Sequence, residues 1–193
     1  MGENLIPLSD RERLAHLVKS TQQHIVLIGM AKRYNWSNGA EIGVLRGKTL
    51  FALLEAVPTL SMIGVDQWKQ LSLRPDENAE TYVDFDMELL ADQVASRARE
   101  FQGRCRILRG DSVEMSGEVP DGSFDFVFID GDHTETGLRR DLLAWAPKVC
   151  DTGMVLGHDC HWSTVRRVID VYCPGWADYG EAVWGLPKSQ VQI

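Results

Sequence analysis

The sequence Ala40-Glu41-Ile42-Gly43-Val44-Leu45-Arg46-Gly47-Lys48-Thr49 joins a short apolar run to a loop that contains two glycines. Glycine lets the backbone approach another group closely, and a glycine loop between a strand and a helix is typical of nucleotide-binding βα units. The spacing differs from the dinucleotide motif GxGxxG. It is also one residue short of the phosphate loop GxxxxGK[ST]. Residues 40–49 therefore predict a strand, loop and helix that approach a ligand without either phosphate motif.

Other apolar runs, each ending near glycine or aspartate, extend this unit into an alternating series. They cover residues 62–65, 106–108, 124–129 and 154–156, and apolar residues with helical spacing fill 90–101 and 165–172. A helix at 22–34 precedes the first strand, and Ser9 begins the capping-box spacing of another. This alternation predicts an α/β fold: a Rossmann-like, doubly wound, mostly parallel sheet with helices on both faces. Residues 176–192, divided by Gly180, predict an antiparallel C-terminal edge hairpin, which completes seven strands.

The composition indicates one folded domain with a net negative charge. The chain has 193 residues, 44% hydrophobic content and a formal net charge of -8. We therefore expect a single domain over 1–193, with an N-terminal helical segment at 1–36. Nucleic-acid binding is not expected, because it needs clustered Lys and Arg. The longest apolar run, 25–31, is too short to span a membrane, and residues 1–10 lack a signal-peptide pattern, so a cytoplasmic location is expected.

Acidic residues follow three successive predicted strands. Glu41 ends the first strand, where a carboxylate would repel phosphate and attract an ammonium group such as that of methionine. Asp66 ends the second strand, where nucleoside-binding folds place a carboxylate that accepts hydrogen bonds from both ribose hydroxyls. Asp111, in Gly110-Asp111-Ser112, is placed to accept a hydrogen bond from the adenine amino group. Together these positions predict a site for S-adenosylmethionine.

The order and spacing of these motifs resemble class I S-adenosylmethionine-dependent methyltransferases. The resemblance rests on the loop 41–47, Asp66, Gly110-Asp111-Ser112 and Phe128-Ile129-Asp130-Gly131-Asp132-His133. The runs 151–160 and 165–168 further resemble the small-molecule branch of that superfamily, in the manner of methyltransferase domain family 24. The resemblance covers most of the chain. It implies that Glu41, Gly43 and Gly47 lie near the methionine moiety, Asp66 at the ribose, and Asp111 and Ser112 near adenine, with Gln67 and Asp130 added to the cofactor-binding set.

Candidates for the reaction follow the fourth and fifth predicted strands, whose loops should border one crevice. They are Asp130, Asp132 and His133 on one side, and His158, Asp159 and His161 on the other. A histidine can deprotonate an acceptor hydroxyl while a carboxylate orients its other ring nitrogen. His133 is the first candidate for this base, and Asp130, Asp159 and His158 complete the predicted catalytic set. Asp132 or Thr134 also has a plain structural interpretation as a helix cap, and His158 has one as a buried histidine.

Two metal sites are alternatives to this arrangement. Asp130 and Asp159 could share a magnesium ion with the acceptor hydroxyl, as in some small-molecule O-methyltransferases that the chain resembles. The loop after the fifth strand lacks the paired ligands of those enzymes, so magnesium is not favoured and no metal ligand is assigned. Cys160, His158 and His161 could bind zinc, but three ligands within four residues lack the usual spaced pairs.

Acceptor binding is assigned to residues 68–86, a long connection that contains Trp68, Tyr82 and Phe85. This segment predicts either a lid with aromatic walls or a solvated insertion. The chain as a whole predicts methyl transfer from S-adenosylmethionine to a small-molecule acceptor, at a hydroxyl oxygen, with N-methylation as an alternative. A nucleotide-binding protein without turnover and an NAD-dependent oxidoreductase stay open, although the missing GxGxxG counts against the latter. The oligomeric state is not predicted, and a homodimer is compatible with the sequence.

Overall fold

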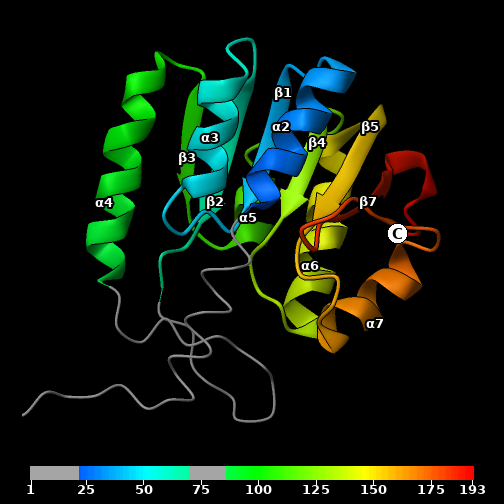
Figure 1. Ribbon diagram of the computed structural model, residues 1–193. Helices are drawn as coiled ribbons and strands as arrows, with labels where there is room; N and C mark the ends of the chain where they lie inside the picture. The colour runs from blue at the N-terminus through cyan, green and yellow to red at the C-terminus, as the bar shows by residue number, and fades with distance from the viewer. Residues whose placement is uncertain (1–21, 70–85) are drawn as a thin grey trace, which may run out of the picture.

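The computed structural model of the protein describes residues 22–69 and 86–193. Within them, seven strands form one sheet in the order β3-β2-β1-β4-β5-β7-β6 (Figure 1). The strands are β1 (Asn38–Ile42), β2 (Ser61–Asp66), β3 (Cys105–Arg109), β4 (Phe124–Ile129), β5 (Val149–Gly157), β6 (Ala177–Asp178) and β7 (Trp184–Pro187). The strands β1 to β5 pair in parallel, whereas β7 runs antiparallel to both β5 and β6. The predicted fold class, including the antiparallel edge, is therefore confirmed.

Helices connect the parallel strands in the order that the sequence predicts. They are α2 (Gln23–Tyr34), α3 (Lys48–Ala56), α4 (Met87–Ala98), α5 (Ser112–Ser116), α6 (Glu135–Trp145) and α7 (Ser163–Tyr172), with the short 3-10 helices η1 (Arg99–Phe101), η2 (Ala146–Lys148) and η3 (Lys188–Gln190). The helix predicted over 22–34 is α2, whereas the helix predicted from Ser9 lies outside the described residues. Across 22–69 and 86–193, every helix is too short or too polar to cross a bilayer.

The strand order reverses at β1, which lies between β2 and β4. The chain extends from β1 through β2 to β3 on one side, and then returns to place β4 and β5 on the other side. In doubly wound sheets, ligands bind at such a reversal, in the crevice outside the carboxyl ends of the strands. The loops after β1 and β4 begin at Gly43 and Asp130, so these residues flank the crevice.

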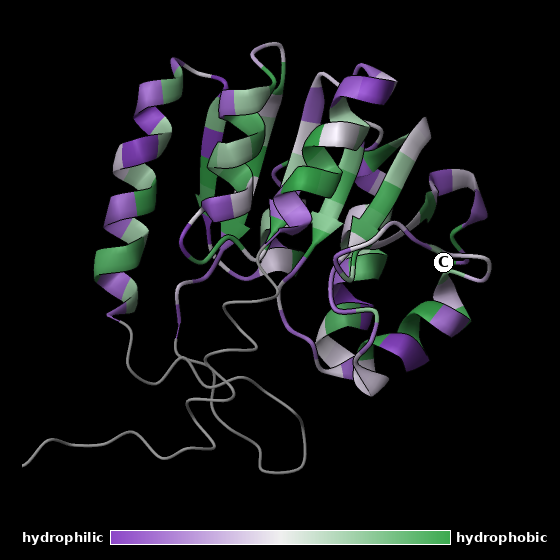
Figure 2. Ribbon diagram, in the orientation of Figure 1, coloured by the Kyte–Doolittle hydropathy of each residue, from purple (hydrophilic) through white to green (hydrophobic). Residues whose placement is uncertain are grey.

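Alternating residues of the central strands fill two hydrophobic layers, one on each face of the sheet. On β4, Phe126 and Phe128 belong to the layer shared with α2, α3 and α4. Val127 and Ile129 belong to the layer shared with α6 and α7. A parallel strand covered on both faces is apolar along its whole length. In Figure 2 the strands are largely hydrophobic, whereas the helices alternate hydrophobic and hydrophilic residues.

The predicted C-terminal hairpin is present as β6 and β7. Its turn closes with a hydrogen bond from the Tyr179 N–H to the Val183 carbonyl oxygen at 2.8 Å. Gly180 has a φ of 95°, in the left-handed region that glycine adopts without steric cost. The long strand β5 begins at Val149, earlier than predicted, because its exposed residues Asp151 and Thr152 break the apolar pattern.

Candidate functional site

Gly43 lies where the backbones after β1 and β4 touch. Its φ is +92°, and a Cβ atom at this position would lie 2.2 Å from the carbonyl oxygen of Asp130. Its N–H donates to the carbonyl oxygen of Val65 at 2.9 Å. A side chain would therefore meet both backbone strain and a steric clash. The close approach predicted for this glycine is made to a neighbouring strand end as well as to the crevice.

The Asp66 carboxylate holds the loop after β1 in place. Its Oδ2 accepts hydrogen bonds from the N–H groups of Val44 at 3.0 Å and Leu45 at 2.8 Å, and its Oδ1 accepts one from Trp68 at 2.7 Å. The buried Trp68 indole donates in turn to the Leu45 carbonyl oxygen at 2.8 Å. Because a carboxylate offers about four acceptor sites, about one remains for a ligand. The predicted ribose residue thus also has a structural task.

Glu41 is buried between β1 and the start of α3. Its side chain is 2% exposed and accepts a hydrogen bond from the Leu50 N–H in the first turn of α3. Burial, and then the charges of Asp130 and Asp66, raise the pKa of this carboxyl well above its ordinary value. The N-cap residue of α3 is Gly47, which has no side chain to satisfy such an N–H group. Glu41 therefore acts as a cap, and its contact with a methionine ammonium group stays a prediction.

An open cleft follows the carboxyl ends of the strands and joins the loops after β1, β2, β3 and β4. Six predicted cofactor residues line it: Gly43, Asp66, Gln67, Asp111, Ser112 and Asp130. Glu41 and Gly47 are not part of this lining. Trp68, which the sequence assigns to an acceptor lid, lines the same cleft. The rest of that segment from 70 to 85, with Tyr82 and Phe85, lies outside the described residues.

At the end of β3, Asp111 begins the short helix α5. Its Oδ1 accepts a hydrogen bond from the Val113 N–H at 3.0 Å and lies 3.3 Å from the Arg140 guanidinium. Asp111 therefore serves as a helix cap, and its predicted contact with the adenine amino group would have to share a carboxylate that is already hydrogen-bonded. At the start of α6, the cap is the Thr134 hydroxyl rather than Asp132.

Asp141 of α6 is a cleft residue that sequence reasoning missed. It is 6% exposed, lines the cleft, and accepts a hydrogen bond from the Ser112 hydroxyl. Burial raises the pKa of Asp141 to about 6, with Asp132 and Asp111 adding to the shift and the Ser112 hydrogen bond opposing it. One signal was available in the sequence, because Asp141 falls at helical spacing on the buried face of α6 beside Leu138, Leu142 and Trp145.

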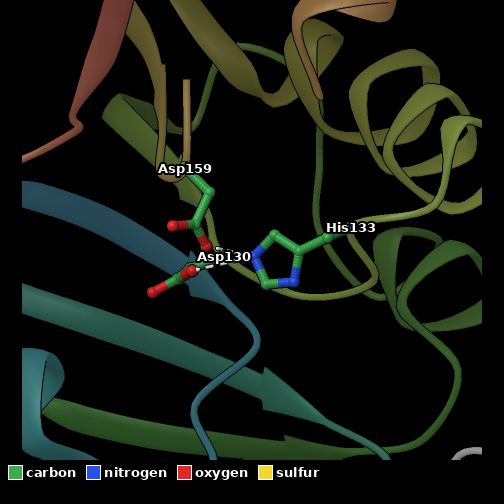
Figure 3. Close-up of side chains that lie close together, drawn as sticks. All are labelled: Asp130, His133 and Asp159. Atoms are coloured by element: carbon green, nitrogen blue, oxygen red, sulfur yellow. Dashed lines mark hydrogen bonds and ion pairs between the residues drawn. The ribbon is translucent and has the colours of Figure 1, made fainter. Parts of the chain in front are cut away.

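The His133 ring faces two carboxylates with one of its nitrogens, as Figure 3 shows. Its Nε2 is 3.3 Å from Oδ1 of Asp130 and 2.9 Å from Oδ2 of Asp159. Asp130 follows β4 and Asp159 follows β5, and these adjacent parallel strands bring the two loops together. The Trp162 ring, whose centroid is 5.0 Å from that of His133, lies beside them and was not singled out from the sequence. Asp130 also lines the cleft, so the cleft and this cluster meet.

His158 belongs to the same cluster from its buried side. Its Nδ1 lies 3.5 Å from Oδ1 of Asp130 and 3.3 Å from Oδ2 of Asp159, and its Nε2 lies 3.1 Å from the Glu181 carbonyl oxygen. A carbonyl accepts, so Nε2 carries the hydrogen. The sequence offered His158 either as a buried histidine or as a member of the catalytic set. In the structure it is buried and also belongs to the cluster. His161 is half exposed, and its Nε2 is 3.9 Å from Asp159.

The two histidines and two aspartates of the cluster hold one another in their charged forms. Burial alone would lower the pKa of His133, but hydrogen bonds to Asp130 and Asp159 outweigh it and raise the pKa to about 10. Burial would also lower the pKa of His158, but Asp130 and Asp159 outweigh it and raise the pKa to about 11. The histidines in turn overcome burial and lower the pKa of both aspartates. At neutral pH the free cluster has two positive and two negative groups.

We expect the stability of the free protein to fall between about pH 6.5 and about pH 10. A histidine whose folded pKa is raised stabilises the fold fully below its unfolded pKa of 6.5, and this contribution is lost as the pH rises through the folded value of about 10. Thermal unfolding across this range, with a chelator present, measures the effect. His133→Asn should show a shallower decline than the unchanged protein, and equal slopes would contradict the cluster charges.

Three side chains of the cluster also have the arrangement of metal ligands. One ligand atom from each of Asp130, His133 and Asp159 lies within 4.8 Å of the others. Two carboxylate oxygens and one imidazole nitrogen suit a divalent cation, and His133 extends the pair of aspartates that the sequence suggested for magnesium. Cys160 is not in this group. The geometry therefore does not support the alternative zinc set.

Residues 40–160 match a protein family described as a methyltransferase domain. This span contains the glycine loop, Asp66, the Ser112 helix and His133. The uncharacterized protein y4gI of Sinorhizobium fredii is 27% identical over 123 residues, which are 62% of this chain and 12% of that protein. The chain therefore spans only about an eighth of the length of this curated relative.

Solved structures share the fold at low sequence identity. The cofactor-bound protein Rv0187 from MTB has a TM-score of 0.64 and 15% identity, with 92% of this chain and 89% of that chain covered. The O-methyltransferase TomG from Streptomyces achromogenes, in complex with S-adenosylmethionine, has a TM-score of 0.58 and 14% identity over 86% and 79% of the two chains. Because the family match spans more than half of the sequence and includes the cleft, the chain belongs to this methyltransferase domain family and has the fold of class I S-adenosylmethionine-dependent methyltransferases.

Proposed function

We propose that the protein transfers the methyl group of S-adenosylmethionine to a hydroxyl oxygen of a small molecule. The observation that carries this proposal is that Asp130 belongs to two structures at once, the cleft and the cluster around His133. A donor bound in the cleft therefore lies beside side chains that can handle an acceptor proton. Membership of a methyltransferase family supports the reaction, and TomG supports both the donor and an oxygen acceptor.

The reacting end of the donor belongs at Asp130, because the methyl group must lie beside the acceptor. The nucleoside then extends along the cleft toward β2 and β3. We assign Asp66 and Gln67 to the ribose, and Asp111 and Ser112 to the adenine ring; all four line the cleft. Gly43 lines this end of the cleft, where it lets the loops after β1 and β4 touch.

The cluster supplies a base for the acceptor hydroxyl. Transfer forms the bond between the acceptor oxygen and the methyl carbon, breaks the bond between sulfur and that carbon, and releases the hydroxyl proton. We assign this proton to His133, with Asp130 and Asp159 orienting the ring. His133 must first lose the proton that it holds in the free protein. A positive sulfonium beside Asp130 favours that loss, because a nearby like charge lowers the pKa of an imidazolium.

The ligand arrangement of Asp130, His133 and Asp159 favours a second way to activate the same hydroxyl. These side chains would hold a divalent cation, which would lower the pKa of a hydroxyl bound to it. His133 would then bind the cation through Nε2 and would not accept the proton. Both versions use the same three residues and give the same products.

Release of S-adenosylhomocysteine across a panel of phenols, catechols, sugars and amines tests the proposal. We expect turnover with a hydroxyl acceptor, measured with added magnesium or manganese and with a chelator. Turnover that survives the chelator supports His133 as the base, whereas turnover restored by a cation supports the metal version. Methylation confined to amines would contradict the oxygen acceptor. Tight binding of the donor with no transfer to any acceptor would favour a binding protein without turnover.

A further inference from the structure

The far end of the cleft contains a hydrogen-bonded pair, Ser112 and Asp141, that methyl transfer itself does not use. Ser112 is the first residue of α5, and Asp141 lies on the buried face of α6. Their side chains are joined by a hydrogen bond between the Ser112 hydroxyl and Oδ1 of Asp141. Both residues line the cleft, and Asp141 is 6% exposed. A cleft ligand can therefore meet the Ser112 hydroxyl while its partner stays buried.

The protonation of Asp141 sets the direction of the Ser112 hydroxyl hydrogen. A hydroxyl has one hydrogen to donate and two lone pairs, and an ionised carboxylate accepts hydrogen bonds without donating any. Beside ionised Asp141, Ser112 must donate its hydrogen to that carboxylate and can offer a ligand only a lone pair. Beside protonated Asp141, Ser112 can accept the carboxyl hydrogen and turn its own hydrogen toward the cleft. The same hydroxyl is thus an acceptor in one state and a donor in the other.

Ser112 is better placed than Asp111 to accept a hydrogen bond from a ligand amino group. The Asp111 carboxylate already accepts from the Val113 N–H and faces the Arg140 guanidinium. The charged groups around Asp141 are Asp132 from the loop after β4, Asp111 from the start of α5, and Arg140 on its own helix. Burial and the two aspartates oppose the ionisation of Asp141, whereas Arg140 favours it. The pKa of Asp141 therefore lies within an accessible pH range.

We propose that Asp141 is a positioning residue for adenine recognition, which in its ionised form holds the Ser112 hydroxyl as an acceptor for the adenine 6-amino group. The inference rests on the proposed binding of S-adenosylmethionine in this cleft. In this arrangement the selection of the nucleobase depends on a buried carboxylate that does not itself need to touch the ligand. A nucleobase with a carbonyl oxygen in place of the amino group would bring that oxygen against a lone pair of the Ser112 hydroxyl. Such a nucleobase would bind poorly.

Calorimetric titration with S-adenosylhomocysteine between about pH 5 and about pH 8 tests this role. The pKa of Asp141 is about 6, so its ionised fraction, and with it the affinity, should fall about tenfold at about pH 5. Asp141→Asn keeps an oxygen that accepts from Ser112 and cannot ionise. It should bind nearly as tightly as the unchanged protein near neutral pH and lose this pH dependence. Ser112→Ala should bind more weakly at every pH, with a flat profile.

S-inosylhomocysteine, which carries a carbonyl oxygen in place of the amino group, provides a second readout that a merely structural role would not change. The unchanged protein should prefer S-adenosylhomocysteine by about tenfold near neutral pH, and this preference should narrow at low pH. The inference would be overturned if the preference for S-adenosylhomocysteine over S-inosylhomocysteine stayed the same at low pH. It would also be overturned if Asp141→Asn kept the pH dependence of binding. Neither result would affect the proposed function. Failure of the unchanged protein to bind S-adenosylhomocysteine at any pH would overturn the proposed function together with the inference.

Discussion

His133→Asn is expected to lower kcat by about 10²- to 10⁴-fold, the range that a positioned acid–base group contributes. Asp130 and Asp159 hold Nε2 at 3.3 Å and 2.9 Å where the cleft meets the cluster, so the acceptor proton is assigned to the other ring nitrogen, Nδ1. Asparagine has no basic nitrogen and cannot take the acceptor proton. The affinity for S-adenosylhomocysteine should stay unchanged, because His133 is not part of the cleft lining. Steady-state kinetics and calorimetry measure the two quantities separately.

His161→Asn is the matched control for this variant. It removes an imidazole from the same region, but His161 is half exposed and its ring nitrogen is 3.9 Å from Asp159. We expect His161→Asn to keep the kcat of the unchanged protein. Equal losses in the two variants would show that the effect belongs to the loop and not to the His133 nitrogen. Full activity in His133→Asn would remove His133 from the reaction.

Asp66→Asn is expected to weaken the binding of S-adenosylhomocysteine by about 10- to 100-fold, since hydrogen bonds to a charged group contribute about 1.5–3 kcal/mol. The variant loses an acceptor for the ribose hydroxyls. Its new amide hydrogens would also face the N–H groups of Val44, Leu45 or Trp68, all of which donate to this carboxylate. The loop that forms one wall of the cleft should therefore loosen. Calorimetric titration gives the affinity, and thermal unfolding reports the loss of stability.

Asp125→Asn separates these two effects, because Asp125 is a similar carboxylate at the opposite end of the sheet. Its Oδ2 accepts from the Ser37 N–H at 2.6 Å, the Ser37 hydroxyl at 3.1 Å and the Asn38 N–H at 2.9 Å. We expect Asp125→Asn to lower thermal stability while the affinity for S-adenosylhomocysteine stays the same. Asp66 would have no ribose role if its variant kept full affinity, or if both variants lost affinity equally.

The strands and the cleft could be predicted because their signals are local in the sequence. A strand buried on both faces, such as β4, is a continuous apolar run, and the glycine or aspartate that follows it marks the carboxyl end. Adjacent strand ends then bring together residues that are distant in the chain, as with Asp130 and Asp159. Gly43, Asp66 and Asp111 of the cleft lining follow from such strand ends, whereas Gln67, Ser112 and Asp130 were expected there from the family resemblance.

The missed features depend on contacts that no local pattern contains. Glu41 belongs to the apolar run of β1, and the sequence does not say that its side chain reaches the Leu50 N–H at the start of α3. Asp141 meets Ser112 across 29 positions of sequence, so their hydrogen bond becomes visible only when α5 and α6 are packed. The charge of the His133 ring depends on two aspartates from different loops. The sequence predicts His133 as a base, but it does not show that Asp130 and Asp159 raise the pKa of its ring to about 10.

The loop after β1 has a consequence for the end of the catalytic cycle. Asp66 fixes this loop through three backbone N–H groups, and Gly43 packs it against Asp130, all without a ligand. A wall that is ordered in advance costs a ligand little conformational entropy. In the proposed arrangement the Asp66 end of this wall faces the ribose, which donor and product share. Under the proposed function, S-adenosylhomocysteine should then bind about as tightly as S-adenosylmethionine and compete with it for the cleft.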